Sequence, residues 1–245
     1  MIFDVKKWKR AFYDSVLLTI ITFLLSSPYL YHFIVHRPDK LSPFNARVSS
    51  LPEGSIGAFI LSQLLMFLLL IFICSFLGFG YWQKYGFKGL GSLNDLRQDL
   101  LYFVPAALAV NLAMYFGFDR HMMMHIPSLY PSSALWGFAK ALMHSTTFEI
   151  VSKFGLVTVA MGIFRNKHVA VIIPAAFFAF LVPNTFFDYN VEFGWNFISV
   201  AAVSTTFIYG VISGYIFVHR GLVSTMTLRF LLDLKYIVYA LLLQS

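Results

Sequence analysis

Ionisable side chains are rare within the apolar stretches of this chain, and most of those present fall into two groups. They are Lys140, His144, Glu149 and Lys153 in one stretch, and Arg229 and Asp233 in another. Glu149 and Lys153 stand four positions apart, as do Arg229 and Asp233. This spacing places both members of a pair on one face of a helix, where opposite charges attract. Each group can therefore neutralise its own charge, or supply acid–base and electrostatic chemistry.

Charged groups at bilayer depth are costly, so they usually face the interior of a helix bundle and have partners there. Cross-pairing of Glu149 with Arg229, or of Lys153 with Asp233, would hold two helices together. The charged residues thus predict a buried polar network between helices that are far apart in the sequence.

The composition indicates which solvent surrounds the helices that carry these groups. Of 245 residues, 59% are hydrophobic and only 12% are charged, and the mean hydropathy is +0.74. A soluble domain is about half apolar and about a quarter charged, so this chain lacks the charge to cover a surface that faces water. We therefore predict an all-α, polytopic membrane helix bundle of about seven transmembrane helices, with about six to eight as the range. The candidate spans are 11–35, 56–82, 98–118, 133–164, 168–187, 196–218 and 222–243.

Basic residues collect in alternate connections between these spans. They are Lys6, Lys7, Lys9 and Arg10, then Lys84, Lys88 and Arg97, then Arg165 and Lys167, and then His219 and Arg220. Because cytoplasmic loops carry an excess of Lys and Arg, this pattern predicts a cell-membrane protein with a cytoplasmic N-terminus, in the inner membrane if the chain is bacterial. The same rule accounts for the net charge of +7, so we expect the lipid bilayer as a partner and no nucleic acid. The connection 36–53 is mixed in charge and departs from the pattern.

The sequence contains little that predicts a metal site or a cofactor site. His121 and His125 are four apart and could share a metal on a helix, but only Asp119 lies nearby as a third ligand. We interpret 119–132 as an external loop with Met and His side chains at the membrane surface. The single cysteine, Cys74, cannot form an internal disulfide, and no nucleotide-binding glycine motif occurs. We therefore expect neither a metal nor a cofactor.

The C-terminal part of the chain resembles the CPBP family of intramembrane endopeptidases, also called the CAAX-type or Abi family. That family carries E-E-x-x-x-R, F-x-x-x-H and H-x-x-x-N on successive helices, with a glycine-rich helix before the last motif. The segments that stand at these motifs are 148–153, 180–184 and 229–233, and the glycines are Gly210, Gly214 and Gly221. The resemblance implies a division into 1–132, an N-terminal membrane segment with three spans, and 133–245, a CPBP-like helical core. The family's catalytic positions would fall on Glu149, Lys153, Asn184, Arg229 and Asp233.

The residues at those positions depart from the family in ways that affect catalysis. Only Glu149 of the glutamate pair is kept, and Asn184 and Arg229 replace the two histidines. A general base must take a proton near neutral pH, which neither the Asn184 amide nor the Arg229 guanidinium can do. We therefore expect impaired or absent peptidase activity, and a role in binding a membrane-anchored peptide or a partner protein.

Two alternatives stay open. The first is an active, metal-independent intramembrane endopeptidase with Glu149 as its base and Arg229 as an oxyanion donor. The second is a transporter or channel component in which Glu149, Lys153, Arg229 and Asp233 line a polar path.

Overall fold

The computed structural model describes residues 5–36, 55–125, 130–187 and 197–242, and every regular element within these ranges is a helix. Among the described residues, five stretches are long and apolar enough to cross a membrane. They are Val5–His32, Gly57–Tyr81, Leu93–Met124, Ala134–Phe164 and Ser199–Arg220. The predicted all-helical, multi-span architecture is thereby supported, whereas the number of about seven spans stays a prediction. The predicted span 168–187 corresponds to an apolar helix that is described over Lys167–Leu181, and this helix is shorter than the five stretches above.

The N-terminal half of the chain forms the first group of helices. They are α1 (Val5–His36), α3 (Ser55–Tyr81), α4 (Leu93–Met114), a π-helical stretch (Tyr115–Asp119) and α5 (Arg120–His125). The C-terminal half forms the second group. They are α6 (Ala134–Met143), two π-helical stretches (His144–Phe148 and Ile150–Val157), α7 (Thr158–Phe164), α8 (Lys167–Phe187), α9 (Phe197–Arg220), α10 (Leu222–Asp233) and α11 (Lys235–Leu242).

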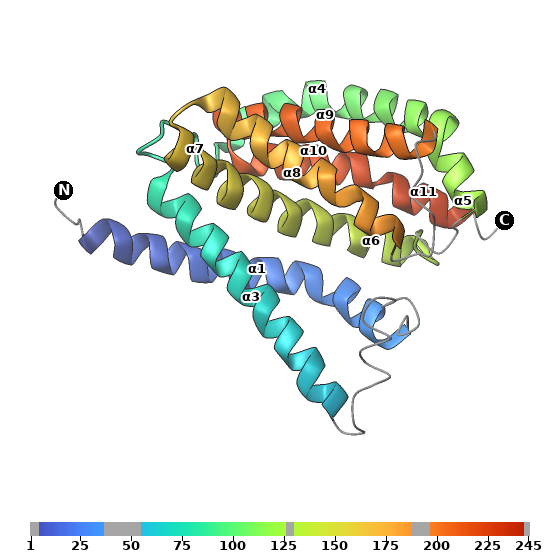
Figure 1. Cartoon of the computed structure of the whole chain (residues 1–245), viewed down its shortest axis with the longest axis horizontal. Helices are drawn as coiled ribbons and strands as arrows, with labels where there is room; N and C mark the ends of the chain where they lie inside the picture. Colours follow the sequence, from blue (N-terminus) through green and yellow to red (C-terminus); the bar gives the residue numbers. More distant parts are fainter. Residues whose placement is uncertain (1–4, 37–54, 126–129, 188–196, 243–245) are drawn as a thin grey trace.

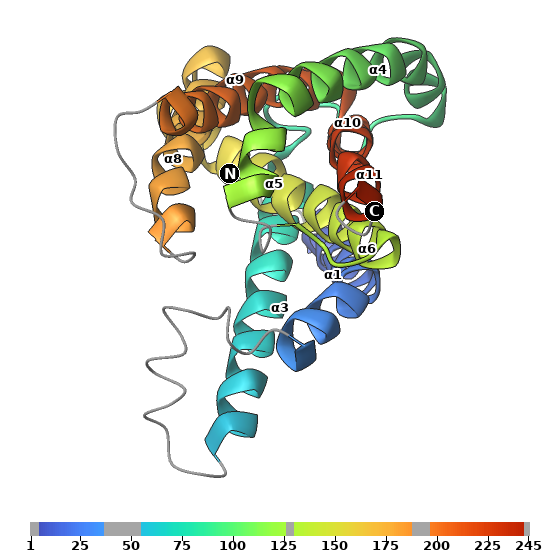
Figure 2. The same cartoon turned by 90° about the vertical axis from the view of Figure 1, so that its right-hand side faces the viewer.

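The helices pack into a bundle from which one helix projects. α8 packs along α9, and α10 packs against both α4 and α9. α1 crosses α3, and the two contact the continuous helix that runs from α6 to α7. The first half of α3 extends away from the rest of the bundle (Figures 1 and 2). Its side chains Leu61, Leu65 and Met66 are more than half exposed, and such an apolar surface suits a lipid environment.

The basic connections lie together at one end of the bundle, as the charge pattern predicts. The beginning of α1, the turn between α3 and α4, and the turn between α7 and α8 occupy the same end (Figure 1). The α9–α10 junction joins them, because the amides of Leu222 and Val223 donate to the carbonyls of Gly89 (2.8 Å) and Leu90 (3.0 Å). Which side of a membrane this end faces stays a prediction.

Gly210 and Gly214 allow α9 to approach α8 closely, as small residues at this spacing do in membrane helices. A Cβ added at Gly210 would lie 2.8 Å from the Ala175 Cβ, and one at Gly214 would lie 2.6 Å from Val171 Cγ1. Both distances are too short for carbon atoms. Larger residues would therefore push the two helices apart.

On α4 and α5, the structure extends one predicted span and replaces part of a predicted loop. α4 begins at Leu93 instead of at 98, because the Ser92 hydroxyl caps it by accepting from the Asp95 amide at 3.0 Å. The predicted external loop 119–132 contains α5 instead. The side chains of Met122 and Met123 are buried in a cluster with Tyr239, so this segment is helical because it packs against α11.

The two helices that carry the charged groups have irregular stretches. The predicted span 133–164 continues through the two π-helical stretches, and the predicted span 222–243 is interrupted at Leu234 between α10 and α11. The proposed division at residue 132 stays a prediction, although α4 packs on α10 across it.

Candidate functional site

Glu149 occupies the junction between the two π-helical stretches and is completely buried. Its Oε1 accepts a hydrogen bond of 2.8 Å from the Tyr209 hydroxyl on α9. Its Oε2 has no hydrogen-bond partner among the described residues. A buried carboxyl group costs less free energy when it accepts such a hydrogen bond, so the Tyr209 hydroxyl stabilises Glu149 in its buried position.

Lys153 is also buried, but it does not form the predicted ion pair. Its Nζ donates to the Gly210 carbonyl at 3.2 Å, and none of the ion pairs among the described residues joins it to Glu149. Lys153 therefore contacts the main chain of α9 instead of the carboxylate on its own helix.

Arg229 and Asp233 do form the predicted pair, with 2.9 Å between Arg229 Nε and Asp233 Oδ2. His144 Nδ1 lies 3.5 Å from the same Asp233 oxygen. The Arg229 guanidinium lies over the rings of Phe148 and Tyr209, 5.0 and 4.9 Å from their centroids. Arginine stacks on aromatic faces in this way because its planar cation is attracted by the ring electrons.

Tyr209 therefore connects the two charged groups, which do not pair with each other. Among the described residues, no ion pair joins Glu149 to Arg229 or Lys153 to Asp233, so the two helices are not held together by the cross-pairs considered in the sequence. The Tyr209 hydroxyl reaches Glu149 and its ring faces Arg229. A tyrosine in an apolar helix is unremarkable in the sequence, and sequence reasoning missed it.

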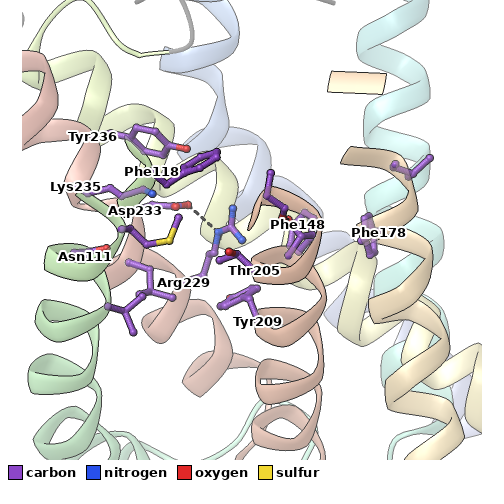
Figure 3. A pocket seen from close by; sticks show the side chains of 16 residues that line it. Asn111, Phe118, Phe148, Phe178, Thr205, Tyr209, Arg229, Asp233, Lys235 and Tyr236 are labelled. Carbon is purple, nitrogen blue, oxygen red and sulfur yellow. Dashed lines mark hydrogen bonds and ion pairs between the residues drawn. The ribbon is translucent and has the colours of Figure 1, made fainter. Parts of the chain in front are cut away.

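A cavity of about 390 Å³ opens beside Arg229 and Asp233. Tyr209 forms part of its wall, and Asn111 and Lys235 lie across from it (Figure 3). The described lining does not include Glu149 or Lys153. The Arg229–Asp233 pair therefore lines the open cavity. Glu149 is buried behind Tyr209, outside the described lining.

Asn184 lies in α8, but its side chain is outside the described residues. Earlier on the same helix, Leu181 and Phe178 contribute to the cavity wall. The helix that carries Asn184 therefore borders the cavity. The proximity of its amide to Arg229 stays a prediction.

A further polar centre lies at the end of the bundle opposite the basic connections, and it was not expected. The Asp119 carboxylate is buried and accepts from Lys235 Nζ and from the Tyr239 hydroxyl, both at 2.8 Å. It also accepts from the Tyr130 hydroxyl at 3.2 Å. Burial and the Asp119 charge raise the pKa of the Tyr130 phenol, which therefore stays a donor. Asp119, considered in the sequence only beside His121, instead joins the end of α4 to α11.

The Tyr209 hydroxyl can be tested separately from its ring. We expect Tyr209→Phe to lower the free energy of unfolding by about 1–3 kcal/mol, because the buried Glu149 carboxylate loses its donor. The ring and its contact with Arg229 are kept. The measurement is thermal unfolding in detergent, and the matched control is Tyr215→Phe on the same helix, whose hydroxyl bonds the exposed His168. Equal unfolding temperatures for the two variants would contradict this role of Tyr209.

Comparison with known protein families, curated proteins and solved structures found no match for the chain.

Proposed function

We propose that the chain is a multi-pass membrane protein, similar to the CPBP intramembrane endopeptidases, that binds the tail of a membrane-anchored peptide or protein without cleaving it. The observation that carries the proposal is the separation between Glu149 and the cavity. Arg229 and Asp233 line the cavity, whereas the residue at the family's catalytic glutamate position is buried outside its described lining.

Cleavage would need a base that reaches a water molecule next to the substrate carbonyl. Glu149 has no exposed surface, and Tyr209 occupies one of its oxygens. Asp233 lines the cavity, but Arg229 holds its Oδ2 at 2.9 Å. A carboxylate in an ion pair favours its charged form and is a weak proton acceptor. The arrangement therefore favours recognition over hydrolysis.

The shape and chemistry of the site favour a lipidated tail as the ligand. Beside the polar cavity lies an apolar cavity of about 560 Å³ between α4 and α10–α11. The two cavities share Asn111 and Lys235 in their linings. Leu108, Leu112 and Val238 are among the side chains of the apolar cavity. An acyl or prenyl chain suits this apolar space, and a peptide carboxylate or carbonyl suits the donors of Arg229 and Lys235.

The proposal can be tested with a fluorescent prenylated peptide that carries a free carboxylate. We expect saturable binding to the detergent-purified protein, measured by fluorescence anisotropy, and weaker binding of the same peptide as its C-terminal amide. Leu108→Trp should raise the dissociation constant about tenfold, a loss of about 1.4 kcal/mol, because it fills the apolar cavity. Leu101→Trp is the matched control on the same helix. Leu101 is 75% exposed, Leu108 is 61% exposed, and only Leu108 lines the cavity.

Two results would overturn the proposal. If the wild-type protein does not bind either peptide, or if both tryptophan variants bind as it does, the cavities are not the binding site. If the peptide is hydrolysed and Glu149→Gln abolishes the hydrolysis, the active endopeptidase is the correct function.

A further inference from the structure

Lys235 belongs to the wall that the polar and the apolar cavities share, and its ammonium uses little of its capacity for hydrogen bonds. Figure 3 shows it among the side chains that line the polar cavity. An ammonium group carries three N–H donors. Its one hydrogen bond to another described residue goes to Asp119 Oδ2, at 2.8 Å. Because the Lys235 side chain is only 15% exposed, acceptors for the other donors have to come from the contents of the cavities.

The Asp119 carboxylate does not depend on Lys235 alone. Its Oδ2 also accepts from the Tyr239 hydroxyl at 2.8 Å, and its Oδ1 accepts from the Tyr130 hydroxyl at 3.2 Å. Each carboxylate oxygen therefore keeps a tyrosine donor when the ammonium turns toward the cavity. A lysine side chain is flexible enough for such a turn, because its charge lies at the end of four rotatable carbons. Lys235 can thus reach a ligand without leaving either oxygen of Asp119 unsatisfied.

The charges around the polar cavity make Lys235 the cation that suits an anionic ligand. The other two charged side chains of the described lining, Arg229 and Asp233, pair with each other at 2.9 Å. Asp119, the counter-ion of Lys235, is 3% exposed and belongs to the described lining of neither cavity. A ligand in the cavity therefore meets the ammonium but not the carboxylate that balances it.

We propose that Asp119 is a positioning residue that sets the affinity of the site for a ligand carboxylate, because it shares the Lys235 ammonium with that carboxylate. The inference rests on the function proposed above, and it assigns the anionic end of the tail to Lys235. The ammonium donates to Asp119 and to the ligand at once, through charge-assisted hydrogen bonds. Two carboxylates then face one cation, and like charges repel each other. Asp119 therefore weakens the binding of an acidic tail and leaves a neutral tail unaffected.

The test compares Asp119→Asn with the wild-type protein, and the probes are the prenylated peptide as its free acid and as its C-terminal amide. The variant keeps an acceptor oxygen but removes the charge that competes for Lys235. In fluorescence anisotropy, we expect the variant to bind the acid about tenfold more tightly and the amide within about twofold of the wild-type affinity. The ratio of the two dissociation constants is the readout, since a loss of folded protein alone would alter both in the same proportion.

Asp99→Asn is the matched control. Asp99 is a buried carboxylate earlier on the same continuous helix, and its oxygen lies 3.6 Å from Arg220 Nε, a cation from another helix. It lies outside the described linings of both cavities. We expect this variant to keep the wild-type ratio of acid to amide affinity, even if its unfolding temperature falls. A wild-type ratio in Asp119→Asn, or an equal change of the ratio in both variants, would overturn the role of Asp119.

Two variants of Lys235 decide the matter even if Asp119→Asn does not fold. Lys235→Gln should lose most of the preference for the acid. Lys235→Arg should keep that preference, because a guanidinium can also donate to two carboxylates. A wild-type ratio in Lys235→Gln would overturn this inference alone, since both peptides would still bind. Failure of the wild-type protein to bind either peptide would overturn the proposed function and this inference with it.

Discussion

Replacing Gly221 by alanine is expected to prevent stable folding. Gly221 lies between α9 and α10 with φ of +102°, in a region of backbone conformation that residues with a Cβ rarely adopt. An added Cβ would also lie 2.6 Å from the Gly91 Cα, in a neighbouring turn. Both sides of this contact are main chain, so no side chain can move to relieve it. We expect a loss of more than about 3 kcal/mol in the free energy of unfolding.

The measurement is the yield of monodisperse protein in detergent together with its thermal unfolding temperature. Gly57→Ala is the control, because an added Cβ there has no atom within 4 Å and alanine favours a helix over glycine. The control should unfold at the wild-type temperature or slightly above it. A Gly221→Ala protein that folds with wild-type yield and stability would show that the α9–α10 turn can be rearranged at little cost.

Removing one member of the Arg229–Asp233 pair is expected to have the second large effect. In Arg229→Leu, the buried Asp233 carboxylate keeps only the His144 imidazole, at 3.5 Å, from its two ion-pair contacts among the described residues. Breaking a buried pair in this way costs about 3–5 kcal/mol. The variant also loses the guanidinium that lies over Phe148 and Tyr209. Thermal unfolding in detergent measures the loss.

The double variant Arg229→Leu with Asp233→Leu should recover part of the stability, because no charge is then left buried without its partner. Arg10→Leu is the control, since Arg10 and Asp14 have the same spacing but are exposed. That change should leave the unfolding temperature nearly unaltered. If the double variant were as unstable as the sum of its single changes, the pair would not act as a unit.

Local spacing was sufficient to predict the Arg229–Asp233 pair, because both residues belong to one helix. The partners that come from other helices could not be predicted in this way. Tyr209 is separated from Glu149 by 60 positions, and Lys235 is separated from Asp119 by 116. Neither Tyr209 nor Lys235 stands out among the aromatic and basic residues at the ends and faces of membrane helices. Their roles depend on how the helices pack, which a single sequence does not specify.

The helices themselves were mostly predictable, because an apolar stretch of sufficient length has few alternatives in a bilayer. The start of α4 shows where this reasoning fails. The candidate span 98–118 left Asp95 outside the helix, but Arg220 contacts the carboxylates of Asp95 and Asp99, and Ser224 donates to Asp99 at 2.7 Å. Acidic residues can therefore lie within a membrane-associated helix when neighbouring helices supply hydrogen-bond donors and cations to their carboxylates.

The shared wall of the polar and apolar cavities affects how a ligand would reach Arg229. Asn111 and Lys235 border both cavities. A molecule dissolved among the lipid acyl chains could therefore diffuse laterally through the apolar cavity to the Arg229 guanidinium without first entering water. Its supply would then depend on its partition coefficient into the bilayer. Even a compound that is almost insoluble in the surrounding aqueous phase could saturate such a site.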